Sequence, residues 1–165
     1  MTTEVFIALG SNLGDRAGQL RKAIESLAAV VALVIRSPVY ETAPQYVTDQ
    51  PAFLNMVLSG ETELEVLPLL EKMQHIEKAL GRVSGQRFGP RAIDLDILFF
   101  GDSVVDTPLL EVPHPRLGER RFVLQPLNDI APAKCHPITG MSVAEMLAAL
   151  PPDDDIRLFP GKSQN

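Results

Sequence analysis

RFGPRAIDLDILFF, residues 87–100, alternates acidic and apolar side chains in a pattern that predicts a β-strand with polar groups on one face. Asp94 and Asp96 fall on one period of the run, while Ile93 and Leu95 fall on the other; successive strand side chains point to opposite faces. At about 3.3 Å per residue, the Cα atoms of the two aspartates lie roughly 6.6 Å apart. Carboxylates at that separation can bind one divalent ion, or bridge two ions about 4 Å apart.

An isolated Asp-x-Asp pair is most often two solvated acids at the end of a strand, but two neighbouring features favour a binding site here. Strict alternation puts Leu98 and Phe100 on the aspartate face, which indicates that this face is covered. Arg87 and Arg91 precede the pair on a Gly-Pro loop, where core packing does not require them. Hard oxygen ligands beside arginines predict Mg²⁺ together with a polyphosphate.

The composition is that of an ordinary globular protein of 165 residues, with 45% hydrophobic and 22% charged residues. We expect one catalytic domain over residues 1–150 and a polar C-terminal tail over residues 151–165. No apolar run is long enough to span a membrane, and the first residues do not resemble a signal peptide. A single cysteine, Cys135, excludes an internal disulfide and is typical of a cytoplasmic protein.

Basic residues are unevenly distributed along the chain. The net charge of -6 argues against extensive nucleic-acid binding. Six of the fifteen basic residues nevertheless lie within one stretch, and all six are arginines: Arg82, Arg87, Arg91, Arg116, Arg120 and Arg121. Because arginine forms bidentate contacts with phosphate, we interpret this stretch as a phosphate site rather than a scattered solvated surface.

Hydrophobic periodicity predicts the element order β-α-β-β-α-β. Four apolar runs predict strands, over residues 4–9, 30–40, 53–62 and 93–100. Two segments with apolar residues at helical spacing predict helices, over residues 20–28 and 65–80. This order is that of an α+β, ferredoxin-like sandwich, here with a proline-rich C-terminal extension.

The segments outside this pattern are predicted to be long loops, short helical turns and a frayed tail. The long loops at residues 42–51 and 82–92 have the length that is typical of binding loops. In the extension we expect short helical turns near residues 120–127 and 142–150, and we expect residues 151–165 to be frayed.

Several motifs together resemble the 6-hydroxymethyl-7,8-dihydropterin pyrophosphokinase family, which acts in folate biosynthesis. The most specific is R-x-G-P-R-x-x-D-L-D-I-L at residues 87–98. The other matching segments, in chain order, lie at residues 8–15, 40–44, 49–55, 112–116 and 119–124. The resemblance therefore covers most of the chain.

This resemblance implies a diphosphotransferase that moves the terminal pyrophosphoryl group of ATP to the hydroxymethyl group of a reduced pterin and releases AMP. Asp94 and Asp96 would hold two Mg²⁺ ions that bind the triphosphate, which suits a reaction governed by positioning and charge neutralisation. Arg82 and Arg91 match loop arginines that approach the phosphates in the transition state. The implied partners are ATP and a dihydropterin, with no nucleic acid and no membrane, and we expect a monomer.

Further positions match the ATP contacts of the family: Gln74, Arg91, Ile97, Glu111, His114, Pro115 and Arg120. Ile97 and Glu111 match main-chain contacts to adenine, so we expect their side chains to matter less. Ser84 replaces a basic residue of some members, so no phosphate contact is expected there. Phe88 replaces a tryptophan of some members, so the closed loop would pack differently.

Four positions match the pterin pocket of the family. Phe53 and Phe122 match two aromatic rings that enclose the flat bicycle; the alternative is that both are core residues. Because aromatic residues make up only 5% of the chain, with no tryptophan, we favour the sandwich. Asn55 can donate and accept hydrogen bonds at the pterin edge, and Thr42 lines the same edge through its backbone.

Two other functions are open at this point. A metal-dependent phosphohydrolase would also use Asp94, Asp96 and the arginines, but it would not need a separate flat pocket. A noncatalytic ligand-binding module would bind a nucleotide without turnover. AMP formation that requires a pterin alcohol separates the pyrophosphokinase from both. Glu77, in the second helix, is interpreted as part of a solvated face.

Overall fold

The structure is a computed structural model, and it describes residues 1–43, 51–81, 92–152 and 155–159. Its elements are β1 (Thr3–Ser11), α1 (Arg16–Leu27), β2 (Ala32–Arg36), β3 (Tyr40–Thr42), β4 (Phe53–Thr62), α2 (Val66–Ala79), β5 (Asp94–Phe100), β6 (Val105–Asp106), β7 (Glu111–Val112), the 3₁₀ turn η1 (Leu117–Glu119), α3 (Arg121–Ile130), α4 (Val143–Ala148) and β8 (Ile156–Leu158). The expected mixture of helices and a β-sheet is confirmed. Within the described ranges, no helix is long and apolar enough to cross a membrane.

Six strands form one antiparallel sheet. β1 lies between β5 and β4, and the other side of β4 pairs with β2 at one end and with β3 at the opposite end. β8 pairs with the outer side of β3, and β6 and β7 form a separate two-stranded ribbon. The register of the three long strands aligns the first residues of β5 with the end of β1 and the beginning of β4, where the candidate site lies.

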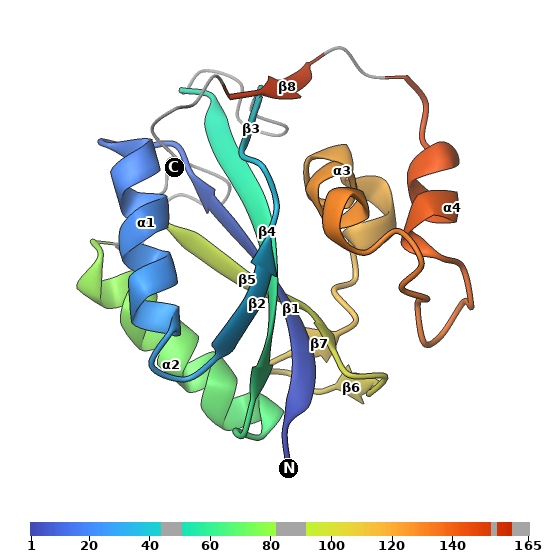
Figure 1. The fold of residues 1–165 in the computed structure, drawn as a ribbon, viewed down its shortest axis with the longest axis horizontal. Helices are drawn as coiled ribbons and strands as arrows, with labels where there is room; N and C mark the ends of the chain where they lie inside the picture. Colours follow the sequence, from blue (N-terminus) through green and yellow to red (C-terminus); the bar gives the residue numbers. More distant parts are fainter. Residues whose placement is uncertain (44–50, 82–91, 153–154, 160–165) are drawn as a thin grey trace.

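The sheet lies between two layers of helices (Figure 1). α1 and α2 cover one face, where Ile7, Leu9 and Ile97 are among the buried residues. α3 and α4 lie on the other face, over a second core that includes Phe6 and Phe99. Because both faces are covered, β1 is an almost continuous apolar run rather than an alternating one.

The strand expected over residues 30–40 is two strands, β2 and β3, separated at Ser37–Val39. Pro38 has no backbone N–H to donate to a ladder. Ser37 instead binds the next strand with both its backbone and its side chain, because its N–H donates to Val57 O at 2.8 Å and its Oγ accepts from Val57 N at 3.0 Å. The break gives β3 its own direction and its own neighbour, β8.

Strict alternation in β5 is confirmed as far as Leu98 and is wrong beyond it. The pairing of β5 with β1 shifts register, so that Ile7 pairs with Ile97 while the preceding residue, Phe6, pairs with Phe99. This irregularity leaves an extra residue in β5, as in a β-bulge. Phe100 therefore packs in the core beneath α1 and α2, and does not share the aspartate face as the alternation predicted.

The C-terminal part differs from the frayed tail that we expected. The helical turns expected near residues 120–127 and 142–150 are α3 and α4, and a capping box formed by Ser142 and Glu145 begins α4. Beyond α4, Ile156–Leu158 forms β8 and extends the sheet. The frayed-tail prediction is therefore wrong for these three residues.

Candidate active site at the open end of the sheet

One row of cross-strand neighbours defines the site. Asp94 pairs with Gly10, Gly10 pairs with Asn55, and Asn55 pairs with Tyr40. With strands about 4.8 Å apart, the Cα atoms of Asp94 and Asn55 lie roughly 10 Å from each other across Gly10. A β-carbon on Gly10 would lie only 3.0 Å from Asn55 Oδ1 and 3.8 Å from a ring carbon of Phe53, so glycine allows these two side chains to lie close to β1.

Asp94 and Asp96 are both half-buried at the beginning of β5, on alternate positions as the sequence predicted. No group of three or more His, Cys, Asp or Glu residues that could hold a metal occurs in the described part of the chain. The two carboxylates fit Mg²⁺, which typically takes one or two carboxylates, substrate phosphates and water. This donor set suits an ion that also binds the phosphates of a nucleotide.

His114 lies beside the aspartates because its backbone N–H donates to Leu98 O of β5 at 3.1 Å. Burial, followed by the nearby Arg120 and Arg116 guanidinium groups, lowers the pKa of His114 to about 4, so the ring is neutral at neutral pH. Its Nδ1 accepts from Arg116 N at 3.2 Å, which places the ring hydrogen on Nε2. Nε2 lies 4.0 Å from Asp96 Oδ2.

Glu77 is a residue whose position the sequence interpretation missed. It is 8% exposed, and its Oε2 accepts from Leu95 N at 2.8 Å, between the two aspartates of β5. Because β5 is at the edge of the sheet, this carboxylate binds a strand N–H that has no strand partner on that side. The signal was present in the spacing, since the buried residues of α2 are Leu69, Met73 and Glu77, each four residues apart.

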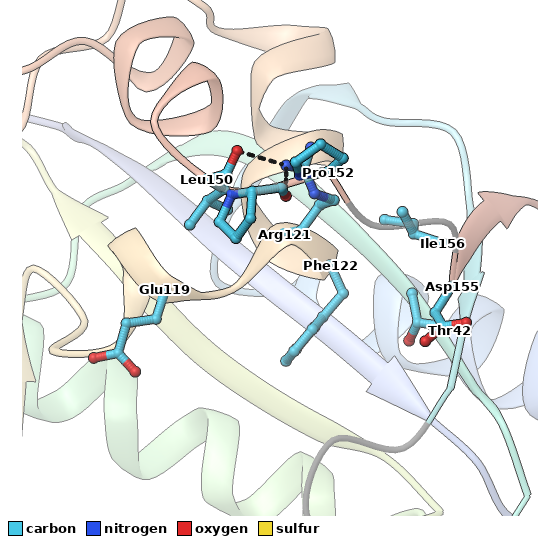
Figure 2. A pocket seen from close by; sticks show the side chains of 9 residues that line it. Thr42, Glu119, Arg121, Phe122, Leu150, Pro152, Asp155 and Ile156 are labelled. Atoms are coloured by element: carbon cyan, nitrogen blue, oxygen red, sulfur yellow. Dashed lines mark hydrogen bonds between the residues drawn. The ribbon is translucent and has the colours of Figure 1, made fainter.

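The residues expected around the pterin lie on β3, β4 and α3. Asn55 is buried and its Nδ2 donates to Thr42 Oγ1 at 2.8 Å, while Phe53 is half-buried two residues earlier in β4. Phe122, on α3, has the Arg120 guanidinium 5.5 Å from its ring centroid. Thr42 and Phe122 line one pocket, shown in Figure 2, with a volume of about 180 Å³; Phe53 and Asn55 are not among its lining residues.

A hydrogen bond connects β3 to α3 across this region. Tyr40 OH donates to Asp129 Oδ2. Burial, reinforced by the Asp129 carboxylate, raises the pKa of Tyr40, so the phenol keeps its proton and remains a donor. Because α3 carries both Asp129 and Phe122, this bond helps to fix the ring of Phe122 relative to the sheet.

The positions expected to contact ATP are spread over several elements. His114 and Arg120 lie close enough for the Arg120 charge to act on the histidine. Glu111 is exposed on β7, which lies beside β5, and Ile97 is buried in β5. Gln74 is exposed on α2. The predicted phosphate arginines, Arg82 and Arg91, lie outside the described residues, as do Ser84, Arg87 and Phe88.

Comparisons with known proteins agree with the resemblance seen in the sequence. The sequence model of the 7,8-dihydro-6-hydroxymethylpterin-pyrophosphokinase (HPPK) family matches residues 6–132. The chain is 43% identical to the 2-amino-4-hydroxy-6-hydroxymethyldihydropteridine pyrophosphokinase of Pseudomonas aeruginosa, over 98% of this chain and 99% of the relative. A protein of the same name from Methylorubrum extorquens is 45% identical, over 91% of this chain and 95% of the relative.

Longer relatives contain the same region. The folic acid synthesis protein fol1 of Pneumocystis carinii is 46% identical over 93% of this chain, but this chain spans only 21% of its length. Among solved structures, wild-type Plasmodium falciparum HPPK-DHPS with pteroate superposes with a TM-score of 0.73 at 17% identity, covering 90% of this chain and 42% of that one. At that identity, the similarity shows the fold alone.

Proposed function

The chain belongs to the 7,8-dihydro-6-hydroxymethylpterin-pyrophosphokinase family, and on that premise we propose that it transfers a diphosphate from ATP to the hydroxymethyl group of 6-hydroxymethyl-7,8-dihydropterin. The hydroxyl oxygen attacks the β-phosphorus and gives up its proton to solvent, the bond between that phosphorus and the α,β-bridging oxygen breaks, and AMP leaves. The observation that carries the proposal is the row Asp94, Gly10 and Asn55, which sets the Asp94 and Asp96 carboxylates roughly 10 Å from the Asn55 amide, across a glycine.

The carboxylates of Asp94 and Asp96 would hold two Mg²⁺ ions, which when bound offset the charge of the triphosphate and orient the β-phosphorus. His114 supports this end of the site as a neutral ring whose Nε2–H faces Asp96. Arg120 adds positive charge next to His114. We also propose, from the motif resemblance, that Arg82 and Arg91 contact the phosphates in the transition state.

The remaining ATP contacts are proposed from the motif resemblance. Gln74 and His114 contact the nucleotide with their side chains, and the backbones of Ile97 and Glu111 contact adenine. The position of β7 beside β5 supports the last assignment, because it brings the backbones of Glu111 and Ile97 to the same side of the sheet edge.

The pterin binds on the other side of Gly10, toward β3 and α3. Phe122 stacks on one face of the flat bicycle and Phe53 on the other. Asn55 donates to Thr42, so its Oδ1 can accept from an N–H of the pterin edge. Thr42 borders the same pocket as Phe122. In this arrangement the hydroxymethyl group points toward the aspartates.

The proposed architecture is a ferredoxin-like core within a single catalytic domain over residues 1–150, acting as a monomer. The sheet order supports the ferredoxin-like core: when β2 and β3 are counted as one interrupted strand, the chain follows β-α-β-β-α-β with spatial order β5-β1-β4-β2/β3. This chain spans 21–25% of the first relatives it matches, so the proposal concerns only the pyrophosphokinase step.

The test is the identity of the nucleotide product. The protein is incubated with ATP, Mg²⁺ and 6-hydroxymethyl-7,8-dihydropterin, and nucleotides are separated by ion-exchange chromatography. We expect one AMP for each pterin diphosphate, and no AMP when the pterin is omitted or replaced by its 6-methyl analogue. ADP as the product would mean attack at the γ-phosphorus, and nucleotide cleavage without pterin would indicate a phosphohydrolase; either result would overturn the proposal.

A further inference from the structure

The pocket that contains Thr42 and Phe122 is built largely from a part of the chain that neither the motifs nor the family match include. The family match ends at residue 132. Beyond it, the pocket is lined by Leu150, Pro151, Pro152, Asp155 and Ile156, as Figure 2 shows. We refer to residues 150–152 and 155–159 as the C-terminal wall.

The first attachment of the C-terminal wall is to α3. Arg121 Nη2 donates to Pro151 O at 2.7 Å and to Leu150 O at 3.3 Å, the dashed contacts in Figure 2. Arg121 is adjacent to Phe122 in the sequence and lines the same pocket. The guanidinium therefore binds the wall to the first turn of α3, which carries the proposed stacking ring.

The second attachment is to the edge of the sheet. In β8, Ile156 pairs with Thr42 and Arg157 pairs with Glu41, and the ladder continues outside the strand where Phe159 N donates to Val39 O at 2.9 Å. Arg157 also forms an ion pair with Glu41 at 3.1 Å. Without β8, the three residues of β3 would form a short exposed edge, and such edges are weakly held.

Both attachments help to position Thr42, one of the proposed pterin contacts. Thr42 receives a hydrogen bond from Asn55 on one side and pairs with Ile156 on the other. The next residue, Ala43, donates its N–H to Asp155 O at 3.3 Å. The position of the Thr42 edge relative to Phe122 therefore depends on β8 and on the Arg121 contacts. β5, which carries Asp94 and Asp96, is separated from β8 by β1, β4 and β3.

We infer that the C-terminal wall is a binding element of the pterin pocket, positioned by Arg121 and β8, and that it contributes to binding of the reduced pterin but not of ATP. This inference rests on the proposed function, because it takes the pocket of Thr42 and Phe122 to be the pterin site. Arg121 is a positioning residue here: it holds the wall through two backbone carbonyls, and the wall and Phe122 enclose the ligand.

Two matched pairs of variants of the full chain test the inference. Arg121→Met removes both hydrogen bonds to the wall, whereas Arg121→Lys keeps a cation that can donate to the same carbonyls. Arg157→Pro interrupts the pairing of β8 with β3, whereas Arg157→Ala removes only the ion pair with Glu41 and keeps the strand. Thermal unfolding of each variant gives the fraction of folded protein, and the binding data are corrected for this fraction.

Equilibrium titrations measure the Kd of 6-hydroxymethyl-7,8-dihydropterin in the presence of a nonhydrolysable ATP analogue, and the Kd of the analogue alone. We expect Arg121→Met and Arg157→Pro each to raise the pterin Kd about tenfold, while Arg121→Lys and Arg157→Ala stay within about twofold of the unmodified chain. The Kd of the ATP analogue should stay within about twofold in all four variants.

An unchanged pterin Kd in both Arg121→Met and Arg157→Pro would overturn the inference, and so would an equal loss of pterin and nucleotide binding. Both results leave the proposed function intact, provided that the unmodified chain still forms AMP from ATP and the pterin. Failure of the unmodified chain to form AMP would instead refute the proposed function and, with it, the assignment of this pocket.

Discussion

The two ends of a single sheet face have opposite characters, although the same three strands build both. At one end, which we call the packed end, large apolar side chains meet α3 and α4; its sheet residues are Phe6, Val57, Leu98 and Phe99. At the other, the polar end, the strands carry a glycine and hydrogen-bonding groups; its residues are Gly10, Asn55, Asp94 and Asp96. Residues that stabilise the fold and residues proposed to act in catalysis therefore lie at different ends of the same strands. A substitution at the packed end should lower stability and spare catalysis, and a substitution at the polar end should do the reverse.

The largest expected effect is the loss of catalysis at the polar end. Asp94→Ala and Asp96→Ala each remove an oxygen ligand from the proposed Mg²⁺ ions, so we expect kcat to fall by about 10⁴-fold, or about 5 kcal/mol of activation free energy. The Tm of the free protein should stay constant or rise, because two neighbouring like charges are relieved. Steady-state AMP formation and thermal unfolding measure the two effects.

Asp106→Ala, an exposed position on β6, is the matched control and should change neither value. If an Asp94 or Asp96 variant unfolded more readily yet kept its activity per folded molecule, that aspartate would be structural, and the division between the two ends would fail.

At the packed end, Phe6→Ala should reduce stability and spare catalysis. Phe6 is 4% exposed and packs edge-on against Phe99, with ring centroids 5.9 Å apart. Removing a buried phenylalanine typically costs about 3–5 kcal/mol of unfolding free energy. Urea unfolding measures the loss, and kcat per folded molecule should match the unmodified chain. A large fall in kcat at full folding would show that the packed end takes part in the reaction.

The proposed pterin residues and the proposed phosphate arginines should affect different quantities, the first pterin binding and the second kcat. Phe122→Ala and Asn55→Ala should raise the pterin Kd by about 10- to 100-fold, since they remove a stacking surface and an edge contact present in every bound state. Arg82→Ala and Arg91→Ala should lower kcat and leave the pterin Kd near normal, because they act in the transition state.

Titration of pterin with a nonhydrolysable ATP analogue, paired with single-turnover rates, measures both quantities for each variant. Arginine variants that lost pterin binding but reacted at the normal rate once bound would assign the arginines to substrate binding instead.

A smaller loss of kcat is expected from substitution of Glu77, which binds β5 between the two aspartates. Glu77→Leu removes the acceptor of Leu95 N–H, so we expect kcat to fall by about tenfold and the Mg²⁺ requirement to rise, because the strand between the two aspartates loses its anchor. Glu77→Gln keeps an acceptor oxygen and should restore kcat to within about twofold. Glu71→Leu, exposed on the same helix, is the control for loss of charge, and it should behave as the unmodified chain.

Measurement of kcat as a function of Mg²⁺ concentration distinguishes a role of Glu77 in positioning the aspartates from a general loss of stability. An equal kcat in Glu77→Leu and Glu77→Gln would mean that the hydrogen bond to Leu95 does not position the aspartates.

Much of the fold follows from local sequence patterns, and the exceptions arise from pairing between distant residues. The apolar runs and helical spacings placed β1, β4, α1 and α2 close to where they lie. The sequence could not show the shifted register at Phe6 and Ile7, because a bulge depends on which residues of two strands face each other. For this reason Phe100 was assigned to the wrong face.

The site shows the same division between local and distant information. The alternation of Asp94 and Asp96 could be predicted, because it depends on a single strand. The contact of Glu77 with Leu95 N could not, because it joins a helix to a strand edge. β8 was also missed: three residues after a proline-containing stretch carry little strand signal alone, and their pairing with β3 makes the strand.

The most direct test of the account is the ³¹P NMR spectrum of the pterin product formed from ATP, recorded for the unmodified chain and for folded Asp94→Asn at equal protein concentration. The account predicts two mutually coupled phosphorus resonances on the product of the unmodified chain, as expected for a diphosphate transferred as a unit. It predicts no detectable product from the variant in the same time. A single uncoupled phosphorus resonance, or the same product at the same rate from Asp94→Asn, would contradict pyrophosphoryl transfer at the polar end of the sheet.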